Sequence, residues 1–300
     1  MKPRVIVVSK RTAYTRFVVE QGDPRAKQLL RRNDPSVASW AAAHQEHERT
    51  LETVEKVLDR AGVQALWVWR AHAMFDDSDA AMVIALGGDG TLLAASHSVD
   101  AAPILGVNSA PGHSVGFFCG ARRNTFAKLF EQALEERLGG VTLTRMFVTV
   151  NGRLHSSRVL NEALYAADSP AATSRYVLEV GKVSEDQRSS GFWIGPAAGS
   201  TAAQRSAGGR VLPLSSKNLQ LVVREPYEPH GQRFRLRQRL IKPAERLKVH
   251  SKMDQAKLWL DGPNRVISVR LGDVVEFGVS AEPLRVLGLN AKAGARALKR

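Results

Sequence analysis

Residues 85–93 read Ala-Leu-Gly-Gly-Asp-Gly-Thr-Leu-Leu and continue an apolar run that begins at Met82. The pattern predicts a buried strand, a glycine turn and a helix that begins near Thr91, with free backbone N–H groups where the helix dipole favours phosphate. The stretch lacks the Gly-Lys-Ser/Thr of a P-loop and the third glycine of the dinucleotide fingerprint. Asp89 places a carboxylate inside this anion cradle, where it would repel phosphate unless a metal ion or a proton transfer uses it. The turn therefore indicates catalysis, and a plain Asp-Gly turn is the alternative.

Strand-like and helix-like segments alternate on both sides of this turn. Apolar runs at Val5–Val8, Val63–Val68 and Ile104–Val107 are typical of buried strands, and helical spacing recurs in Leu51–Ala61 and Phe126–Leu134. Glycines follow both expected helices, as C-terminal caps often do. The alternation favours a mostly parallel sheet covered by helices.

From about residue 141 the pattern becomes short, β-rich runs between turn residues, which predicts an all-β second domain. Asn151-Gly152 and Asp261-Gly262 lie between such runs and are expected to form tight hairpin turns. Arginines alternate with apolar residues over Arg233–Leu240, which predicts a strand with a basic face. The expected strands are Met146–Val150, Tyr176–Val180, Leu219–Val223, Lys257–Leu260 and Val266–Val269.

The 300 residues include 43 lysines and arginines against 29 acids, a formal net charge of +14. Such an excess attracts anions, including nucleotides, polyphosphate and nucleic acid, and does not choose among them. No apolar run approaches the roughly 20 residues that a membrane-spanning helix needs. Cys119 is the single cysteine, so an internal disulfide is excluded and a reducing interior suits the chain. We therefore expect a cytoplasmic protein.

Three motifs make the resemblance to a known family specific. Gly87–Thr91 resembles the signature of the superfamily that contains NAD kinases, diacylglycerol and sphingosine kinases and, more distantly, phosphofructokinases. Leu160–Ala163 resembles the Asn-Glu motif of NAD kinases. Gly199–Ala202, followed by Ser206–Gly209, resembles their glycine-rich segment. The order and the separations also match, so the chain is similar to the NAD kinase family.

Two departures indicate a branch of that family. Most bacterial NAD kinases carry an Asp-Gly pair before the glycine-rich segment and a tyrosine after it, whereas this chain has Ser190 and Ala203. Together with Ala197–Ala203 and Val223–Pro226, these positions resemble the plant-type NADH kinases and, more loosely, the mitochondrial NAD kinases. An acid and an aromatic ring that usually frame the dinucleotide are missing.

The resemblance implies an α/β N-terminal domain joined to an all-β C-terminal domain, the two-domain fold of NAD kinases. Residues 1–140 would form the nucleotide-binding domain and residues 141–273 a β-sandwich-like dinucleotide-binding domain. The family's fold also allows residues 274–300 to return to the first domain.

It also implies site residues, position by position. Asp89 would be the catalytic base that accepts the proton of the adenosine 2′-hydroxyl. Phe117 stands where the family often stacks an aromatic ring near the substrate, and no metal-ligating residue is assigned. The remaining positions would bind the donor phosphates (Gly87, Gly88, Gly90 and Thr91) or line the dinucleotide site (Asn161, Glu162, Ser190, Thr201, Ala202 and Ser206).

The implied activity is ATP-dependent phosphorylation of NADH, NAD or both, giving NADPH or NADP. ATP with Mg²⁺ is the expected phosphoryl donor, while other triphosphates, polyphosphate and the choice between NAD and NADH stay open. We expect small-molecule substrates, a homodimer or higher homo-oligomer, and neither nucleic acid nor membrane as a partner. Two alternatives are a lipid kinase of the same superfamily, against which the Asn-Glu and glycine-rich motifs argue, and a non-catalytic basic nucleic-acid-binding protein.

Four further side chains receive no functional role. His44 and His47 are expected on a solvated helix face, because their spacing is not that of a zinc protease. Trp67 and Trp69 alternate along a predicted strand, and neither is assigned a function.

Overall fold

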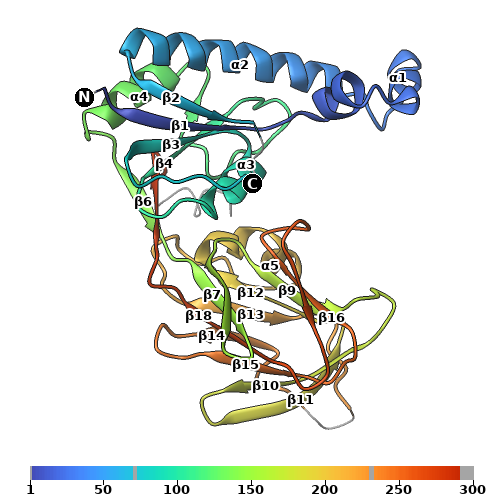
Figure 1. Cartoon of the computed structure of the whole chain (residues 1–300). Helices are drawn as coiled ribbons and strands as arrows, with labels where there is room; N and C mark the ends of the chain where they lie inside the picture. The colour runs from blue at the N-terminus through green and yellow to red at the C-terminus, as the bar shows by residue number, and fades with distance from the viewer. Residues whose placement is uncertain (1, 70–72, 230–232, 291–300) are drawn as a thin grey trace. The chain divides into compact units, whose positions relative to one another are not determined.

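The computed structural model describes residues 2–69, 73–229 and 233–290 of the chain. The chain divides into two compact units (Figure 1). Unit 1 comprises Met1–Val141 and Arg285–Asn290, and unit 2 contains Thr142–Leu284. No helix within these described ranges is long and apolar enough to cross a membrane.

Unit 1 contains a mostly parallel sheet with the strand order β2-β1-β3-β4-β19-β6, and β5 pairs with β4. β1 pairs in parallel with β2 on one side and with β3 on the other, so the winding direction of the chain reverses between β1 and β3. Such a switch point opens a crevice at the carboxyl ends of the strands, where ligands of this fold class bind. The strands are β1 (Arg4–Ser9), β2 (Gln64–Val68), β3 (Ala80–Gly87), β4 (Ile104–Asn108), β5 (Ala121–Arg122), β6 (Gly140–Leu143) and β19 (Leu284–Leu287).

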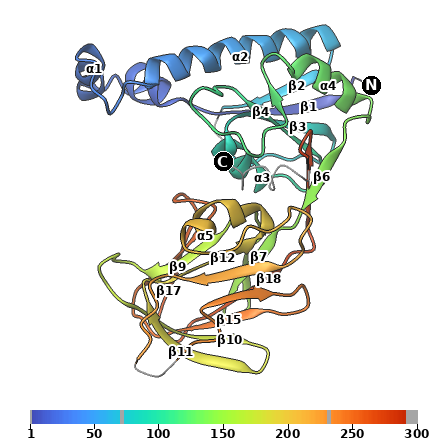
Figure 2. The same cartoon turned by 180° about the vertical axis from the view of Figure 1, so that it is seen from behind.

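Helices cover both faces of this sheet, α2 and α4 on one and α3 on the other (Figures 1 and 2). Val54 and Leu58 of α2 pack with Phe126 and Phe130 of α4 onto the buried strands. α2 ends where Gly62 adopts the left-handed conformation, as predicted. The helical segments are a π-helical turn (Thr15–Glu20), α1 (Pro24–Arg31), α2 (Trp40–Ala61), α3 (Asp89–Ser96) and α4 (Phe126–Leu134).

Unit 2 is built from two six-stranded sheets, ordered β11-β10-β15-β18-β7-β8 and β14-β13-β12-β9-β16-β17. Apolar side chains of both sheets form one core, in which the rings of Tyr165, Tyr176 and Phe192 are in contact. This core confirms the predicted all-β, sandwich-like architecture. The first sheet consists of β7 (Met146–Val150), β8 (Arg153–Val159), β10 (Ser174–Val180), β11 (Val183–Ser189), β15 (Leu247–Ser251) and β18 (Val274–Val279). The second consists of β9 (Ala163–Ala167), β12 (Phe192–Pro196), β13 (Leu219–Val223), β14 (Gln238–Ile241), β16 (Ala256–Leu260) and β17 (Val266–Val269).

Only a short C-terminal segment belongs to unit 1. β18 pairs with β7 and β15 inside unit 2, so residues 274–284 belong to that unit, and the return begins at Arg285. The ten residues from 291 onward lie outside the described residues.

The two predicted hairpin turns differ. Asn151-Gly152 joins β7 to β8 as a two-residue turn with positive φ at both positions, as predicted. Asp261-Gly262 instead begins a five-residue connection, residues 261–265, between β16 and β17. The prediction of a tight turn there is wrong, because Asp261 is held by hydrogen bonds to a distant loop.

The predicted strand with a basic face is mostly wrong as well. β14 begins only at Gln238, and the residues before it form a turn. The backbone N–H groups of Arg235 and Leu236 donate to the Glu185 carboxylate over 2.7 and 3.0 Å, and the Leu236 side chain is fully buried. These hydrogen bonds use N–H groups that a strand would direct to a neighbouring strand.

Candidate functional site

The glycine turn after β3 is shaped by two neighbouring side chains. A Cβ on Gly87 would meet Thr91 Oγ1 at 2.1 Å, and one on Gly88 would meet Ser114 Oγ at 2.4 Å. Thr91 is buried and supports the turn from inside. Gly90 is exposed and has nothing within 4 Å of its Cβ position, so its backbone is accessible to a ligand.

Asp89 lies in the first turn of α3, which begins two residues before the predicted position because Gly88 is its N-cap. Its carboxylate oxygens accept hydrogen bonds from the backbone N–H groups of Phe117 (2.9 Å) and Phe118 (2.8 Å). Each carboxylate oxygen keeps a further lone pair. The carboxylate is therefore fixed in orientation and can still accept a proton. Phe118 is buried, whereas Phe117 is partly exposed at the same loop.

In unit 2, one carboxylate holds the loop that carries Asn161 and Glu162. Asp261 accepts hydrogen bonds from three consecutive backbone N–H groups, those of Leu160 (2.8 Å), Asn161 (2.7 Å) and Glu162 (3.1 Å). The Asp261 N–H donates in return to the Glu162 carbonyl over 2.9 Å. Sequence reasoning missed this role, because no local pattern connects positions a hundred residues apart.

The glycine-rich segment packs directly on the same loop. A Cβ on Gly199 would lie 1.9 Å from the Asn161 carbonyl oxygen, and one on Gly195 would lie 2.1 Å from it, so only glycine allows this approach. Gln204 Nε2 donates to that oxygen over 3.2 Å. The structure thus brings the two motifs together. Beside them, Thr201 is the last residue of a 3₁₀ turn (Ala197–Thr201), Ala202 is the N-cap of α5 (Ala203–Ser206), and Ser206 is the last residue of α5. Thr201 and Ala202 are partly exposed, and Ser206 is exposed.

Two buried polar atoms at this cluster have no hydrogen-bond partner among the described residues, Asn161 Oδ1 and Glu162 Oε2. Each residue is only 9% exposed. Burial, with a smaller contribution from the Asp261 charge, raises the pKa of Glu162 to about 8. The carboxyl is therefore mostly protonated near neutral pH, and it can donate as well as accept. Buried polar atoms are normally paired, so these atoms indicate a polar ligand.

Comparison with known proteins agrees with this arrangement. Residues 20–138 match the family described as ATP-NAD kinase N-terminal domain. The probable NADH kinase of Oryza sativa subsp. japonica is 31% identical over 281 residues, which cover 86% of each chain. The chain belongs to the NAD kinase family. The NADH kinase of Arabidopsis thaliana is 34% identical over 267 residues, 80% of this chain and 83% of that protein. The predicted similarity to plant-type NADH kinases is confirmed.

Solved structures of NAD kinase family members share the fold. An NAD kinase from Archaeoglobus fulgidus in complex with ATP has a TM-score of 0.68 and 19% identity, and the match covers 99% of this chain and 97% of that chain. Yeast NADH kinase complexed with NADH has a TM-score of 0.69 and 13% identity, over 100% and 87% of the two chains. At these identities the match supports the fold alone, and it confirms the predicted combination of an α/β and an all-β part.

Ser190, a position that departs from most bacterial NAD kinases, lies apart from the Asn161 cluster. Asn161 and Glu162 precede β9 and Ser190 precedes β12, and the two strands are antiparallel neighbours. In this register Ser190 is five residues of strand rise from Glu162 and six from Asn161, so the two groups lie at opposite ends of these strands, about 16–20 Å apart.

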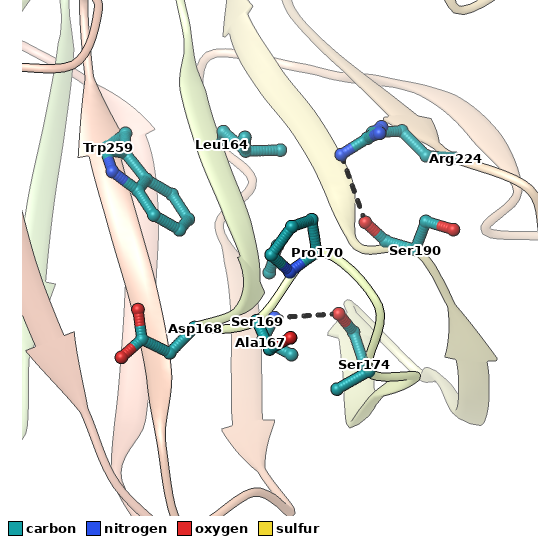
Figure 3. Close-up of a pocket in the computed structure, with 11 residues that line it drawn as sticks. Leu164, Ala167, Asp168, Ser169, Pro170, Ser174, Ser190, Arg224 and Trp259 are labelled. Carbon is teal, nitrogen blue, oxygen red and sulfur yellow. Dashed lines mark hydrogen bonds between the residues drawn. The ribbon is translucent and has the colours of Figure 1, made fainter.

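Ser190 lines a pocket of about 310 Å³ with Leu164, Pro170, Arg224 and Trp259 (Figure 3). Arg224 Nη1 donates to the Ser190 carbonyl oxygen over 3.2 Å, and Arg224 Nε lies 3.8 Å from Glu225 Oε2, so a guanidinium paired with a carboxylate lines the pocket beside Ser190.

We expect Glu162→Gln to remove a pH dependence of stability. The folded chain keeps the proton of Glu162 up to a pKa of about 8, whereas the unfolded chain releases it near 4.5. Between these values the unfolded state binds fewer protons, so the free energy of unfolding falls as the pH rises. Glutamine has the same shape and does not titrate, so the variant should lose this decline. Denaturant unfolding across the interval measures it.

Glu52→Gln is the control, because Glu52 is exposed on α2. It should keep the wild-type decline. Identical slopes for wild type and Glu162→Gln would contradict a buried, protonated carboxyl.

Proposed function

We propose that this chain is an ATP-dependent kinase that phosphorylates the adenosine 2′-hydroxyl of NADH and NAD. One observation carries the proposal. Asn161 and Glu162 present unpaired, buried polar atoms beside the glycine-rich segment, in a chain that matches plant NADH kinases over most of its length. The comparisons favour neither a lipid kinase nor a nucleic-acid-binding protein.

In the proposed reaction, the 2′-oxygen attacks the γ-phosphorus of ATP and the bond from that phosphorus to the β–γ bridging oxygen breaks, which releases ADP. Asp89 accepts the hydroxyl proton and later returns it to solvent. Phosphoryl transfer depends mostly on positioning and charge stabilisation, and Mg²⁺ is proposed to accompany ATP as part of the substrate. The accessible backbone of Gly90 at the N-terminus of α3 is suited to the donor phosphates.

The dinucleotide is assigned to the loop that Asp261 anchors. Asn161 Oδ1 accepts from a ligand N–H or O–H group, and the protonated Glu162 carboxyl either donates or accepts. Both atoms suit the adenine amino group and the ribose hydroxyls. Thr201, Ala202 and Ser206 are proposed to line the same site.

We also propose a preference for NADH at least equal to that for NAD. The oxidised nicotinamide ring carries a positive charge and the reduced ring does not. The Ser190 pocket contains the Arg224 guanidinium and has a serine where most bacterial relatives carry an acid, and its one lining carboxylate among the described residues, Asp168, is paired with Lys257 at 2.5 Å. A nicotinamide bound within about 8 Å, one Debye length, would experience this charge, which disfavours the oxidised ring.

A homodimer or larger homo-oligomer and a cytoplasmic location remain proposals. The support for the first is the family resemblance, and for the second the single cysteine. Cys119 is partly buried, and burial raises the pKa of its thiol to about 12, so the thiol is neutral near pH 7.

Asp89→Asn is expected to lower turnover by roughly 10²–10⁴, the contribution of a positioned general base. The amide also loses one of the two hydrogen bonds to the loop at Phe117 and Phe118, at a cost in stability of about 1–3 kcal/mol. Turnover is therefore measured at a temperature where circular dichroism shows the variant folded. Asp59→Asn, at an exposed position of α2, is the control. A folded Asp89→Asn variant with wild-type turnover would exclude the base.

Asn161→Ala should raise the KM for the dinucleotide by about tenfold, because it removes a hydrogen-bond partner and leaves a polar group of the substrate unpaired. The KM for ATP should not change, since the loop backbone stays anchored by Asp261. Steady-state kinetics with each substrate varied in turn give both constants, with exposed Asn124→Ala as the control. An unchanged dinucleotide KM would remove Asn161 from the site.

Ser190→Asp should shift the ratio of the specificity constants toward NAD, by about tenfold if the new charge contact is worth about 1.4 kcal/mol. Ser190→Asn adds similar volume without charge and should leave the ratio near that of the wild type. An unaltered ratio in Ser190→Asp would overturn the electrostatic explanation. A wild-type enzyme that strongly prefers NAD would overturn the proposed preference itself.

A further inference from the structure

Arg265 lies in unit 2, at the same end of the second sheet as Asn161 and Glu162. It directly precedes β17, and the Leu260 N–H donates to the Arg265 carbonyl over 2.9 Å. On its other side Leu260 pairs with Ala163, the first residue of β9. Ala163, Leu260 and Arg265 therefore form a row across three strands. Two strand spacings place the Arg265 Cα about 10 Å from the Ala163 Cα.

The strand register explains why Arg265 is only partly exposed although it lies at the end of a sheet. β16 and β17 pair Trp259 with Val266, so Arg265 follows as the partner of Leu260. Residues opposite each other on antiparallel strands share one face of the sheet. The Leu260 side chain is buried in the sandwich core. The Arg265 side chain therefore starts on the core side of the sheet, next to the Asp261 anchor.

The Arg265 guanidinium carries a charge that the described residues do not pair. Its Nε is buried without a hydrogen-bond partner, and Arg265 forms no ion pair within the described part of the chain. Burial lowers the pKa of Arg265, and the nearby Asp261 charge opposes this shift. Asp261 itself accepts from three backbone N–H groups. A partly desolvated cation with an unpaired donor is costly, and a bound anion would offset the cost.

A buried histidine of unit 1 shows the contrast. His47 is buried and does not lie on a solvated helix face as predicted. Its ring nitrogens contact Ser9 Oγ (3.4 Å) and Ser109 Oγ (2.9 Å), and burial lowers its pKa to about 4. His47 is therefore neutral at pH 7 and connects α2 to the ends of β1 and β4. Its polar atoms need no ligand, whereas the buried Nε of Arg265 lacks a partner.

The charge of Arg265 suits the ligand proposed for this end of the sheet. The pyrophosphate of a dinucleotide is negatively charged, and the Asp261 carboxylate beside the loop would repel it. A guanidinium offsets this repulsion and can bind two phosphate oxygens at once. No cation is among the residues assigned to the Asn161 site, which are Asn161, Glu162, Thr201, Ala202 and Ser206.

A phosphate can reach Arg265 from solvent. Residues 262–264, in the connection between β16 and β17, are exposed, and Gly262 has nothing within 4 Å of its Cβ position. A long arginine side chain also covers most of the distance to Ala163, the residue after Glu162. One ligand can therefore contact Arg265 and the Asn161 loop together.

We propose that Arg265 binds a phosphate group of the dinucleotide, while Asn161 and Glu162 contact its adenosine part. The inference deepens the proposed function and rests on it for the identity of the ligand. Two phosphates share this chemistry, the pyrophosphate of substrate and product and the 2′-phosphate of the product alone. Titration of both dinucleotides separates them.

Calorimetric titration without ATP tests the contact, with NADH, NADPH and adenosine as probes. Arg265→Met should weaken NADPH by about tenfold or more, because it removes a charge-assisted contact to phosphate. Adenosine has no phosphate and should bind as to the wild type. An equal loss for NADH assigns the contact to the pyrophosphate, and an unchanged affinity for NADH assigns it to the 2′-phosphate. Arg265→Lys keeps the charge and should retain much of the affinity.

Salt dependence provides a readout that a purely structural role of Arg265 would not change. The affinity of the wild type for NADPH should fall as the ionic strength rises, and it should fall less steeply in Arg265→Met. Arg270→Met is the matched control, because Arg270 is exposed and follows the other end of β17. It should keep the wild-type affinities. Thermal melting verifies that each variant is folded.

Wild-type affinity for NADPH in folded Arg265→Met would overturn the contact. An equal loss of adenosine affinity, an unchanged salt dependence, or a wild type that binds neither dinucleotide would overturn it as well. A wild type that binds the dinucleotide through Arg265 but forms no phosphorylated product from ATP would overturn the proposed function and leave the contact standing.

Discussion

The Asp261 carboxylate accepts three consecutive backbone N–H groups, and the candidate site of unit 2 depends on this interaction. The same device recurs in unit 1. Asp89 accepts from two N–H groups at Phe117 and Phe118, and buried Asp77 accepts from three at residues 100–102. Loops that expose their N–H groups need such partners, because a buried, unpaired N–H is costly. Charged acceptors form the stronger hydrogen bonds, so these loops are held in one conformation.

This way of fixing loops has an electrostatic consequence. The Asp261 charge lies close to Glu162 and, after burial, is the second cause that raises the pKa of that carboxyl. The anchor therefore favours a neutral, protonated Glu162 beside the unpaired Oδ1 of Asn161. In the free protein these two buried polar atoms lack hydrogen-bond partners, and a ligand with matching donors and acceptors would supply them. The unpaired atoms lower the stability of the free protein, and the hydrogen bonds that a ligand forms with them add to its binding free energy.

The proposed chemistry is distributed over the two units in a way that follows their architectures. A parallel sheet directs the carboxyl ends of its strands, and the helix N-terminus after β3, to one edge, which suits phosphates. An antiparallel sandwich has no such edge, and its polar site is built where β9 starts and the glycine-rich segment follows β12. The site depends on close packing of backbone against backbone, because Gly195 and Gly199 lie against the Asn161 carbonyl, where a side chain would not fit.

The sequence by itself determined the features that local patterns encode. The change of apolar period near residue 141 predicted an α/β part followed by an all-β part, and Asn151-Gly152 predicted its turn because φ/ψ preferences are local. The motifs around Asp89, Asn161 and Gly199 identified the family.

The tertiary structure alone decided which distant residues meet. It pairs Asp261 with a loop a hundred residues earlier, places Ser190 at the far end of β12 from Asn161, and buries His47 against Ser9 and Ser109. It also shortens the predicted basic strand, which begins only at Gln238 because the Arg235 N–H donates to the Glu185 carboxylate in the preceding turn. Contacts of this kind depend on strand order and packing, and no spacing along the chain records them.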